Sequence, residues 1–388
     1  MNLRHSLLLV TLAFGAGLFF TLWKRNELPD FAAPAQPEAA VGAEEAVAIK
    51  SDAFTLRLLQ AAMDCTEGNI LLAPHALTEN LRVLHHMSQG ATQAELGALK
   101  LNTVQQSAPE DAGEAAILFH DNSLQYSDNA PADNAIPVPL GGKAAEPILI
   151  LNSILAEVTG DTQAHFINSE HLPAGSRLVS FCTLTLQPAW KYPVRSYKEA
   201  HADFFNANGS MPQIRTVQSC GAFRQAKAQD DTWQAIAIPL QLSPKSAKDE
   251  CLLLIMPREH SARRFAQQLS PELLNTIRQA LAEAGPSSLC VEFPRLSFAP
   301  PTQDLLPILR ALGLKTLLSP RAEIGGLAKD KPLFLNAVLQ KCRIPLVENR
   351  PELPQDMPDL RLDKPFVWMI GSLHSSAPPY AIGIVENL

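Results

Sequence analysis

Three observations on the sequence predict an α+β fold. Between residues 51 and 88 the apolar side chains recur at helical spacing, which predicts helices with one buried face. The second half of the chain instead alternates short apolar runs, typical of strands, with helical stretches. The composition, 46% hydrophobic and 18% charged, is that of a globular protein, and 388 residues are enough for a sizeable core.

The amino terminus carries the pattern of a targeting segment. Basic residues flank both ends of an apolar run over residues 7–23, which is long enough to cross a bilayer. No small-residue cleavage pattern follows this run before Ala32, which favours a retained anchor over a cleaved peptide. We interpret residues 1–25 as a signal peptide or an N-terminal membrane anchor.

A linker follows the targeting segment. Residues 26–47 are rich in Pro, Ala and Glu and have few large apolar side chains, so they cannot bury enough surface to offset their ordering entropy. Residues 48–388 then form the folded domain. We expect this domain to be extracytoplasmic, either secreted or tethered to the membrane through residues 7–23 alone, because the flanking charges leave the orientation of the run open.

Several functional classes are excluded by what the sequence lacks. The net charge of -7, without a dense Lys/Arg stripe, excludes a nucleic-acid binder. No nucleophile with a base and no phosphate-cradling glycine loop stands out, so we expect neither an enzyme with catalytic residues nor a cofactor. The six cysteines are scattered singly, and neither they nor the histidines at 75, 85 and 86 have metal-site spacing. We expect no metal, and most cysteines as small buried hydrophobes, with any disulfide connectivity open.

The expected elements follow from local patterns, in chain order. Apolar residues at helical spacing predict helices over residues 51–63, 76–88, 147–158, 269–284 and 305–312. Apolar runs bounded by turn residues predict strands over 177–186, 233–240, 251–256, 289–293 and 333–347, and a closing hairpin of 366–372 with 380–385. Pro74 suits the first turn of the second helix. Residues 102–143 are polar, weakly patterned and broken by prolines, so the pattern assigns no element there and leaves their structure open.

Short motifs along the chain resemble the serpin family in their order and spacing. Each is mostly apolar core with a turn residue, so the resemblance rests on the order that they share. They are Gly68–Pro74, Gly90–Thr92, Leu151–Leu155, Arg177–Val179 with Trp190 and Pro193, Ala237–Leu240, Leu254–Pro257, Phe293–Arg295, Leu312–Leu314, Asp363–Phe366 and Gly383–Asn387. The resemblance covers residues 51–388 and implies a serpin-like fold, with large mixed β-sheets and helices packed around them.

The resemblance also implies a function, which is the inhibition of serine-type endopeptidases. A serpin is a metastable protein whose exposed reactive-centre loop is cut by a protease and then inserts as a new central strand of the large sheet. Insertion needs a hinge of small residues that can enter a sheet, and a loop long enough to span that sheet. The composition and length of the corresponding segment therefore test whether this chain can work in that way.

The segment in the position of the reactive loop departs from these requirements. Glu348 stands at the acidic turn of the family, but the stretch 349–361 contains no Gly, Ala or Thr, and only 17 positions separate Glu348 from Pro365. Its prolines lack the N–H donor that a central strand needs. The residues of this reactive-loop remnant are Glu348, Arg350, Pro351, Pro354, Met357, Pro358 and Arg361.

We therefore expect a non-inhibitory member of the family that acts as an extracytoplasmic binding protein. The alternative is a protease inhibitor that uses the short Pro-rich loop as a substrate mimic, with Arg350, Met357 or Arg361 as its primary side chain. The partner is then a protease or another extracytoplasmic protein, and the oligomeric state stays open. Without insertion, we expect a relaxed state of ordinary stability.

The region that gates sheet opening in the family also departs from the pattern. Its residues here are Ala73, Ala76, Cys182, Gln340 and Cys342. The resemblance implies serines at the positions of Ala73 and Ala76 and asparagine at that of Cys182, so we expect a polar cluster to have become apolar. Cys182 and Cys342, on strands that the family places side by side, either form a disulfide that locks the sheet or remain two separate buried thiols.

Overall fold

The computed structural model describes residues 41–101, 113–125, 127, 135–141, 145–161, 165–187, 189–241, 250–329, 332–350, 357–374 and 377–388, with the backbone alone described for 41–51 and 197–200. The chain divides into a short unit, Met1–Ala43, and a large one, Glu44–Leu388, whose fold is presented below. The apolar run of the predicted targeting segment lies outside the described residues. Within the described ranges, no helix is long and apolar enough to cross a membrane.

The helices begin and end where their local sequence allows. They are α2 (Val41–Cys65), α3 (Pro74–Met87), α4 (Gly90–Ala98), α5 (Ala145–Thr159), α6 (Ala262–Gln268), α7 (Pro271–Ala284) and α8 (Leu306–Ala311). In α7 the hydroxyl of Ser270 accepts a hydrogen bond from the N–H of Leu273, and Pro271 occupies the first turn, where its missing N–H costs nothing. Gly285, at φ 66°, ends the same helix in a conformation that favours glycine.

A six-stranded sheet forms one part of the domain. Its order is β10 (Leu296–Phe298), β12 (Ala337–Leu346), β4 (Leu178–Thr185), β2 (Gly113–Asp121) and β3 (Ala135–Val138), with β11 (Gln303–Asp304) also paired to β12. The central strand β4 is buried along nearly its whole length, as expected for a strand that is covered on both faces.

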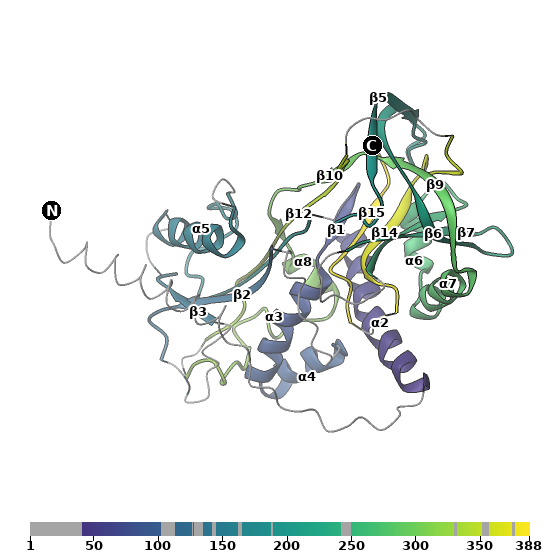
Figure 1. Cartoon of the computed structure of the whole chain (residues 1–388). Helices are drawn as coiled ribbons and strands as arrows, with labels where there is room; N and C mark the ends of the chain where they lie inside the picture. Colours follow the sequence, from purple (N-terminus) through teal and green to yellow (C-terminus); the bar gives the residue numbers. More distant parts are fainter. Residues whose placement is uncertain are drawn as a thin grey trace, which may run out of the picture. The chain divides into compact units, whose positions relative to one another are not determined.

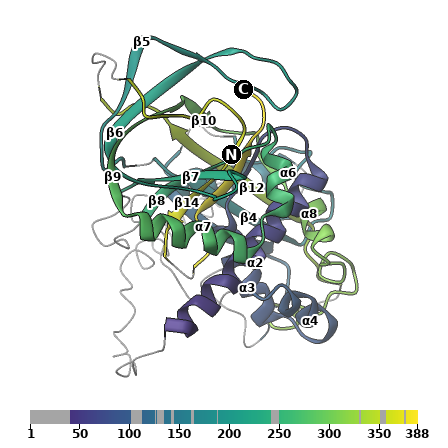
Figure 2. The ribbon, with the colours of Figure 1, turned by 90° about the vertical axis from the view of Figure 1, so that its right-hand side faces the viewer.

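A nine-stranded sheet forms the other part. Its order is β1 (Ile70–Leu72), β15 (Ala381–Val385), β14 (Phe366–Ser372), β8 (Glu250–Pro257), β7 (Trp233–Pro239), β6 (Gln213–Lys227), β9 (Pro286–Pro294) and β13 (Leu360–Arg361), with β5 (Val194–Asp203) paired to β6. β6 is the organising strand because it pairs with β5, β7 and β9 along its length. α7 packs against β6 and β7 (Figure 2).

The six-stranded sheet lies between two hydrophobic layers. On one face, Leu151 and Leu155 of α5 pack with side chains of β2, β4 and β12, among them Phe119 and Phe181. On the other face, Leu77 and its neighbours on α3 join the main core, which continues under the nine-stranded sheet. Figure 1 shows α5 and α3 on opposite sides of this sheet. The sheet is therefore covered on both faces where β4 and β12 pair.

The structure confirms the α+β class and adjusts the predicted elements. Helix α2 is longer than the predicted 51–63 and begins inside the predicted linker. The predicted strand 333–347 is shorter, because residues 333–336 are not in the sheet. The weakly patterned stretch 102–143, where no element was predicted, contains β2 and β3 in its described part. Sequence patterns missed β2 because it is buried on both faces and lacks the alternation of a half-exposed strand.

Candidate functional site

The seam between β4 and β12 is where the resemblance implies strand insertion. The two strands pair directly and in parallel over seven register positions, from Ala337 opposite Val179 to Arg343 opposite Thr185. No other strand lies between them. The sheet is thus closed at the place that an inserted loop would occupy.

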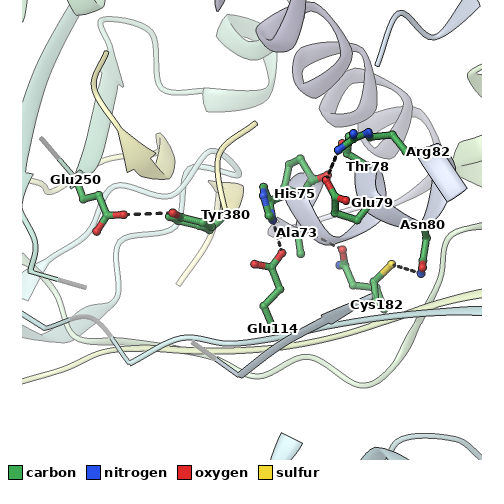
Figure 3. A network of polar contacts seen from close by, with 12 residues as sticks. Ala73, His75, Thr78, Glu79, Asn80, Arg82, Glu114, Cys182, Glu250 and Tyr380 are labelled. Atoms are coloured by element: carbon green, nitrogen blue, oxygen red, sulfur yellow. Dashed lines mark hydrogen bonds and ion pairs between the residues drawn. The ribbon is translucent and has the colours of Figure 1, made fainter. Parts of the chain in front are cut away.

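Polar contacts from Asn80 of α3 hold β4, the strand on one side of the seam. The side-chain amide of Asn80 donates to the Ser180 hydroxyl at 2.9 Å and to the Phe181 carbonyl at 3.1 Å, and its nitrogen lies 3.4 Å from the Cys182 sulfur (Figure 3). Asn80 is 1% exposed. The expectation of an apolar cluster was therefore wrong. Ala76 is apolar and buried, but Asn80, one helical turn further along the same face of α3, supplies the polar contact.

Gln340 fastens the β12 side of the seam. Its Oε1 accepts a hydrogen bond from the backbone N–H of Ala73 at 2.8 Å. Its Nε2 donates to the carbonyl of Leu71 at 3.1 Å and to Oε1 of Gln303 at 2.7 Å. Because Gln340 is 1% exposed, these bonds have no water to replace them. One side chain thereby joins β12 to β1, to β11 and to the start of α3.

A second buried network begins one residue after Pro74. His75 Nδ1 lies 2.8 Å from a carboxylate oxygen of Glu114 on β2, and the ring of His75 packs edge-on against Tyr380 (Figure 3). The hydroxyl of Tyr380 in turn donates to Glu250 on β8 at 3.2 Å. This chain of contacts joins α3 to both sheets. No local pattern predicts this network, since His75 contacts groups that are distant along the chain.

The two cysteines near the seam remain separate thiols. Cys182 lies opposite Gln340, and Cys342 lies opposite Leu184, so the two cysteines are two positions out of register. Both are free and buried, and the hypothesis of a bridge between them was wrong because register, not sequence, decides which side chains meet. Burial raises the pKa of the Cys182 thiol to about 12 and also raises that of Cys342, so neither is a reactive thiolate.

A disulfide does form elsewhere. Cys220 on β6 and Cys290 on β9 are directly opposite each other and are bonded, with their Cα atoms 4.0 Å apart. This bridge joins two strands that β7, β8, α6 and α7 separate in sequence. No local pattern could have identified the pair.

The amino-terminal side of the loop is bound to the domain immediately after β12. Glu348 accepts a hydrogen bond from Arg295 at 2.7 Å. Burial disfavours charge on Glu348, but the bond from Arg295 and the positive charges of Arg295 and Arg215 outweigh it and hold the pKa of this carboxyl below its usual value. The next residue, Asn349, exchanges two hydrogen bonds with the backbone of Val194, at 3.0 and 2.9 Å.

The carboxyl-terminal side of the loop is bound to the edge of β9. Asp359 donates its N–H to the Cys290 carbonyl at 2.8 Å and accepts the Cys290 N–H on its side chain at 2.7 Å. Arg361 then donates to the buried carboxylate of Glu292 at 3.0 Å, and the same carboxylate accepts the hydroxyl of Thr216 at 2.7 Å. The loop residues between Arg350 and Asp359 are thus fixed at both ends.

The residues at the two bound ends of the loop lie in one row across the nine-stranded sheet. Each residue of this cross-strand row lies opposite the next in register: Arg350, Arg195, Gln218, Glu292 and Arg361. Register partners on adjacent strands point to the same face. The loop therefore leaves the sheet at one end of the cross-strand row and returns at the other end, across β5, β6 and β9.

Comparison with known proteins identifies the fold. The family model described as Serpin (serine protease inhibitor) matches residues 141–387, which is more than half of the chain. The chain belongs to the serpin family. Among its relatives, an alpha-1-antitrypsin-like protein of Ictidomys tridecemlineatus is 28% identical over 145 residues, 35% of this serpin and 34% of the relative. Iripin-8 of Ixodes ricinus is 20% identical over 363 residues, 81% of this serpin and 87% of the relative.

The chain spans only about a third of the length of two of these relatives, the alpha-1-antitrypsin-like protein and alpha-1-antiproteinase S of Cavia porcellus. Solved structures extend the likeness over the whole fold. Native protease nexin-1 with heparin superimposes with a TM-score of 0.73 at 17% identity, over 89% of this serpin and 100% of the other chain. Uncleaved ovalbumin gives 0.74 at 13% identity, over 88% and 100%. At such low identity these structures show the fold alone.

The predicted loop residues of this serpin differ in their exposure to solvent. Met357 is 93% exposed, Arg350 is exposed, and Pro358 is half-buried. Arg361 is held by Glu292 in the cross-strand row, so it is not presented as a free recognition side chain. Pro351 and Pro354 lie outside the described residues. Ala73, Ala76, Cys182, Gln340 and Cys342 are all buried, with Cys182 opposite Gln340 across the seam and Gln340 bonded to the N–H of Ala73.

Proposed function

We propose that this serpin is an extracytoplasmic binding protein that does not trap proteases by loop insertion. Members of its family typically pair with proteases and are inhibitors rather than enzymes. The proposal keeps residues 1–25 as an export signal or anchor, 26–47 as a linker and 48–388 as the folded domain. The disulfide between Cys220 and Cys290 supports an oxidising location outside the cytoplasm.

The observation that carries the proposal is that the loop is short and is bound to the domain at both ends. An inserted strand would have to match β12, which spans ten residues, and would also need residues to turn. The chain from Val347 to Met357 is barely longer than β12 itself. Its first residues are already held by Arg295 and Val194, and those bonds would have to break before the segment could move.

Proline strengthens this argument from the sequence alone. Each residue of a central strand donates its N–H to one neighbouring strand, and proline has no N–H to donate. Pro351 and Pro354 both lie in the segment that would become the inserted strand. Insertion between β4 and β12 would therefore leave a buried carbonyl unpaired at each proline, at about 1–3 kcal/mol apiece.

Incubation of the full-length chain, in a non-ionic detergent, with serine and cysteine proteases tests the proposal. Denaturing gel electrophoresis then separates a covalent complex from simple cleavage. We expect cleavage in the loop or resistance, with no band at the summed mass of the two proteins. A summed band that survives boiling in detergent would overturn the proposal, because only covalent trapping produces it.

One observation favours a second candidate function, reversible inhibition through the short loop. Met357 is 93% exposed in a segment whose ends are fixed, which is the arrangement of a preorganised substrate mimic. In that case a protease that prefers unbranched apolar side chains is inhibited without a covalent complex. Met357→Asp abolishes this inhibition, whereas an equal inhibition constant for the variant excludes it.

A further inference from the structure

Two arginines stand side by side at the base of the loop without an acceptor. Arg195 at the start of β5 and Arg350 form a parallel bridge, so their side chains project to the same face on adjacent strands. Nε of Arg195 is buried and has no hydrogen-bond partner among the described residues. Within the same part of the chain, no ion pair joins either guanidinium to a carboxylate. We call Arg195 and Arg350 the arginine pair.

This arrangement is unfavourable for the protein alone. Neighbouring strands lie about 4.8 Å apart, and like charges directly opposite each other destabilise a sheet. A buried N–H without an acceptor adds its desolvation cost. The other arginine of the cross-strand row, Arg361, avoids both costs because it donates to Glu292. Among the residues that the structure describes, the arginine pair has no such carboxylate, although the two guanidiniums could bind one together.

The surroundings of the arginine pair are also positive. Arg215, on β6, and Arg295, between β9 and β10, are both exposed, and the N–H of Arg295 donates to the carbonyl of Arg215 at 2.9 Å. The carboxylate that faces these two is Glu348, two residues before Arg350, and Arg295 already binds it. Arg215 and Arg295 thus add positive charge near the residue where the described part of the loop begins, in a protein whose net charge is -7. Such a local surplus attracts anions and speeds their encounter.

We propose that the arginine pair is a receptor for a carboxylate of an acidic segment in a protein partner. The guanidinium forks match the two oxygens of a carboxylate, and an anion between them relieves their repulsion and satisfies the buried Nε. This inference rests on the proposed binding function and names the chemistry of its partner. Binding there also clamps Arg350 against β5, and so fixes the amino-terminal base of the loop.

A protein fits this site better than a sulfated polysaccharide does. The arginine pair is compact, with Arg195 half-buried and Arg350 exposed on the adjacent strand. The same loop presents Met357, whose apolar side chain is 93% exposed. An exposed apolar side chain on the same segment as a charge pair is typical of a protein interface, whereas a polysaccharide has no use for the methionine.

The test measures binding of fluorescein-labelled poly-L-glutamate to the full-length chain in non-ionic detergent, by fluorescence anisotropy at low salt. Arg195→Gln and Arg350→Gln are each expected to weaken binding by about tenfold, the effect of losing a charge-assisted hydrogen bond. Arg310→Gln is the matched control, since it makes the same charge change on α8, which joins β12 near Val338, at the opposite end of that strand from the loop. It is expected to weaken binding less than twofold.

Thermal unfolding gives a second readout. Without poly-L-glutamate, Arg195→Gln is expected to raise the melting temperature, because it removes the like-charge contact with Arg350. With poly-L-glutamate, the melting temperature of the wild type rises and that of Arg195→Gln does not. A structural role for Arg195 predicts the reverse, a lower melting temperature for the variant without any ligand.

Three outcomes would overturn the inference. The first is that Arg310→Gln weakens binding as much as the variants of the arginine pair do, which would indicate non-specific attraction. The second is that poly-L-glutamate does not bind to the wild type. The third is that heparin binding depends on the arginine pair while poly-L-glutamate binding does not. The protease gel experiment is independent of these outcomes. A covalent complex there defeats the proposed function, whereas a failed anisotropy experiment without a covalent complex defeats only the identity of the partner.

Discussion

Gln340 is the side chain whose replacement tests most sharply how the seam is held. Gln340→Met keeps the volume of the side chain but removes both of its hydrogen-bonding groups. The N–H of Ala73 then loses the acceptor at 2.8 Å and remains buried, since Ala73 is 0% exposed. The carbonyl of Leu71 and Oε1 of Gln303 each lose a donor as well.

The magnitude follows from the surroundings of each partner. The buried N–H of Ala73 bears nearly the full cost of an unmade bond, about 2–3 kcal/mol. A carbonyl with a second lone pair and a half-buried side chain that can turn to water each lose less, about 0.5 kcal/mol. Gln340→Met is therefore expected to lower the free energy of unfolding by about 3–4 kcal/mol. Gln340→Ala lowers it by a further 1 kcal/mol or so, because it adds a cavity.

Urea-induced unfolding of the full-length chain in non-ionic detergent, followed by tryptophan fluorescence, measures these differences. Gln303→Ala is the control, since it removes one half-buried partner and leaves the bonds of Gln340 to Ala73 and Leu71 in place. It is expected to cost less than about 1 kcal/mol. If Gln340→Met also stays within about 1 kcal/mol of the wild type, the reasoning about the seam is wrong.

Three further predictions follow from the buried thiols, the disulfide and a buried histidine. Cys182 and Cys342 should resist alkylation in the native protein at about pH 8, because burial raises their pKa values. Both should react fully in urea, as mass spectrometry can show. Rapid labelling of the native protein would mean that the seam opens readily. Replacing Cys220 and Cys290 by serine opens a bridge of sequence separation 70 and should cost about 2–4 kcal/mol in urea unfolding, whereas an unchanged midpoint would contradict a native bridge. Burial lowers the pKa of His120 from its usual 6.5, so the unfolded state takes up the proton first. The free energy of unfolding should therefore fall as the pH drops below that value. His120→Phe should flatten this dependence on pH, and an equal slope in the variant would exclude the histidine as its source.

Local patterns predicted the elements whose signals are local. The helix α7 was recognised because its apolar positions have helical spacing, and Ser270, Pro271 and Gly285 mark its ends. The strands β4 and β12 were recognised as apolar runs bounded by turn residues. β6 was missed because its exposed face is polar and because three different strands pair with it, a fact that no window of sequence contains.

The candidate site was predicted only in outline. The position of the loop and the residues of the sheet-opening region followed from the resemblance, but their contacts did not. The polar contact to β4 comes from Asn80, one helical turn after Ala76, and the register of β4 and β12 keeps Cys182 apart from Cys342. The arginine pair depends on the pairing of β5 with the chain after β12, which joins residues 155 positions apart. Such contacts are set by tertiary packing, and a single sequence does not reveal them.

The melting temperature of the full-length chain before and after cleavage in the stretch 351–358 tests the central claim most directly. Inhibitory serpins gain a large increment of stability when the cut loop inserts. The closed seam and the short, doubly bound loop predict a change of no more than a few degrees here. A large rise after cleavage would show that the loop enters the sheet between β4 and β12, and would contradict the account.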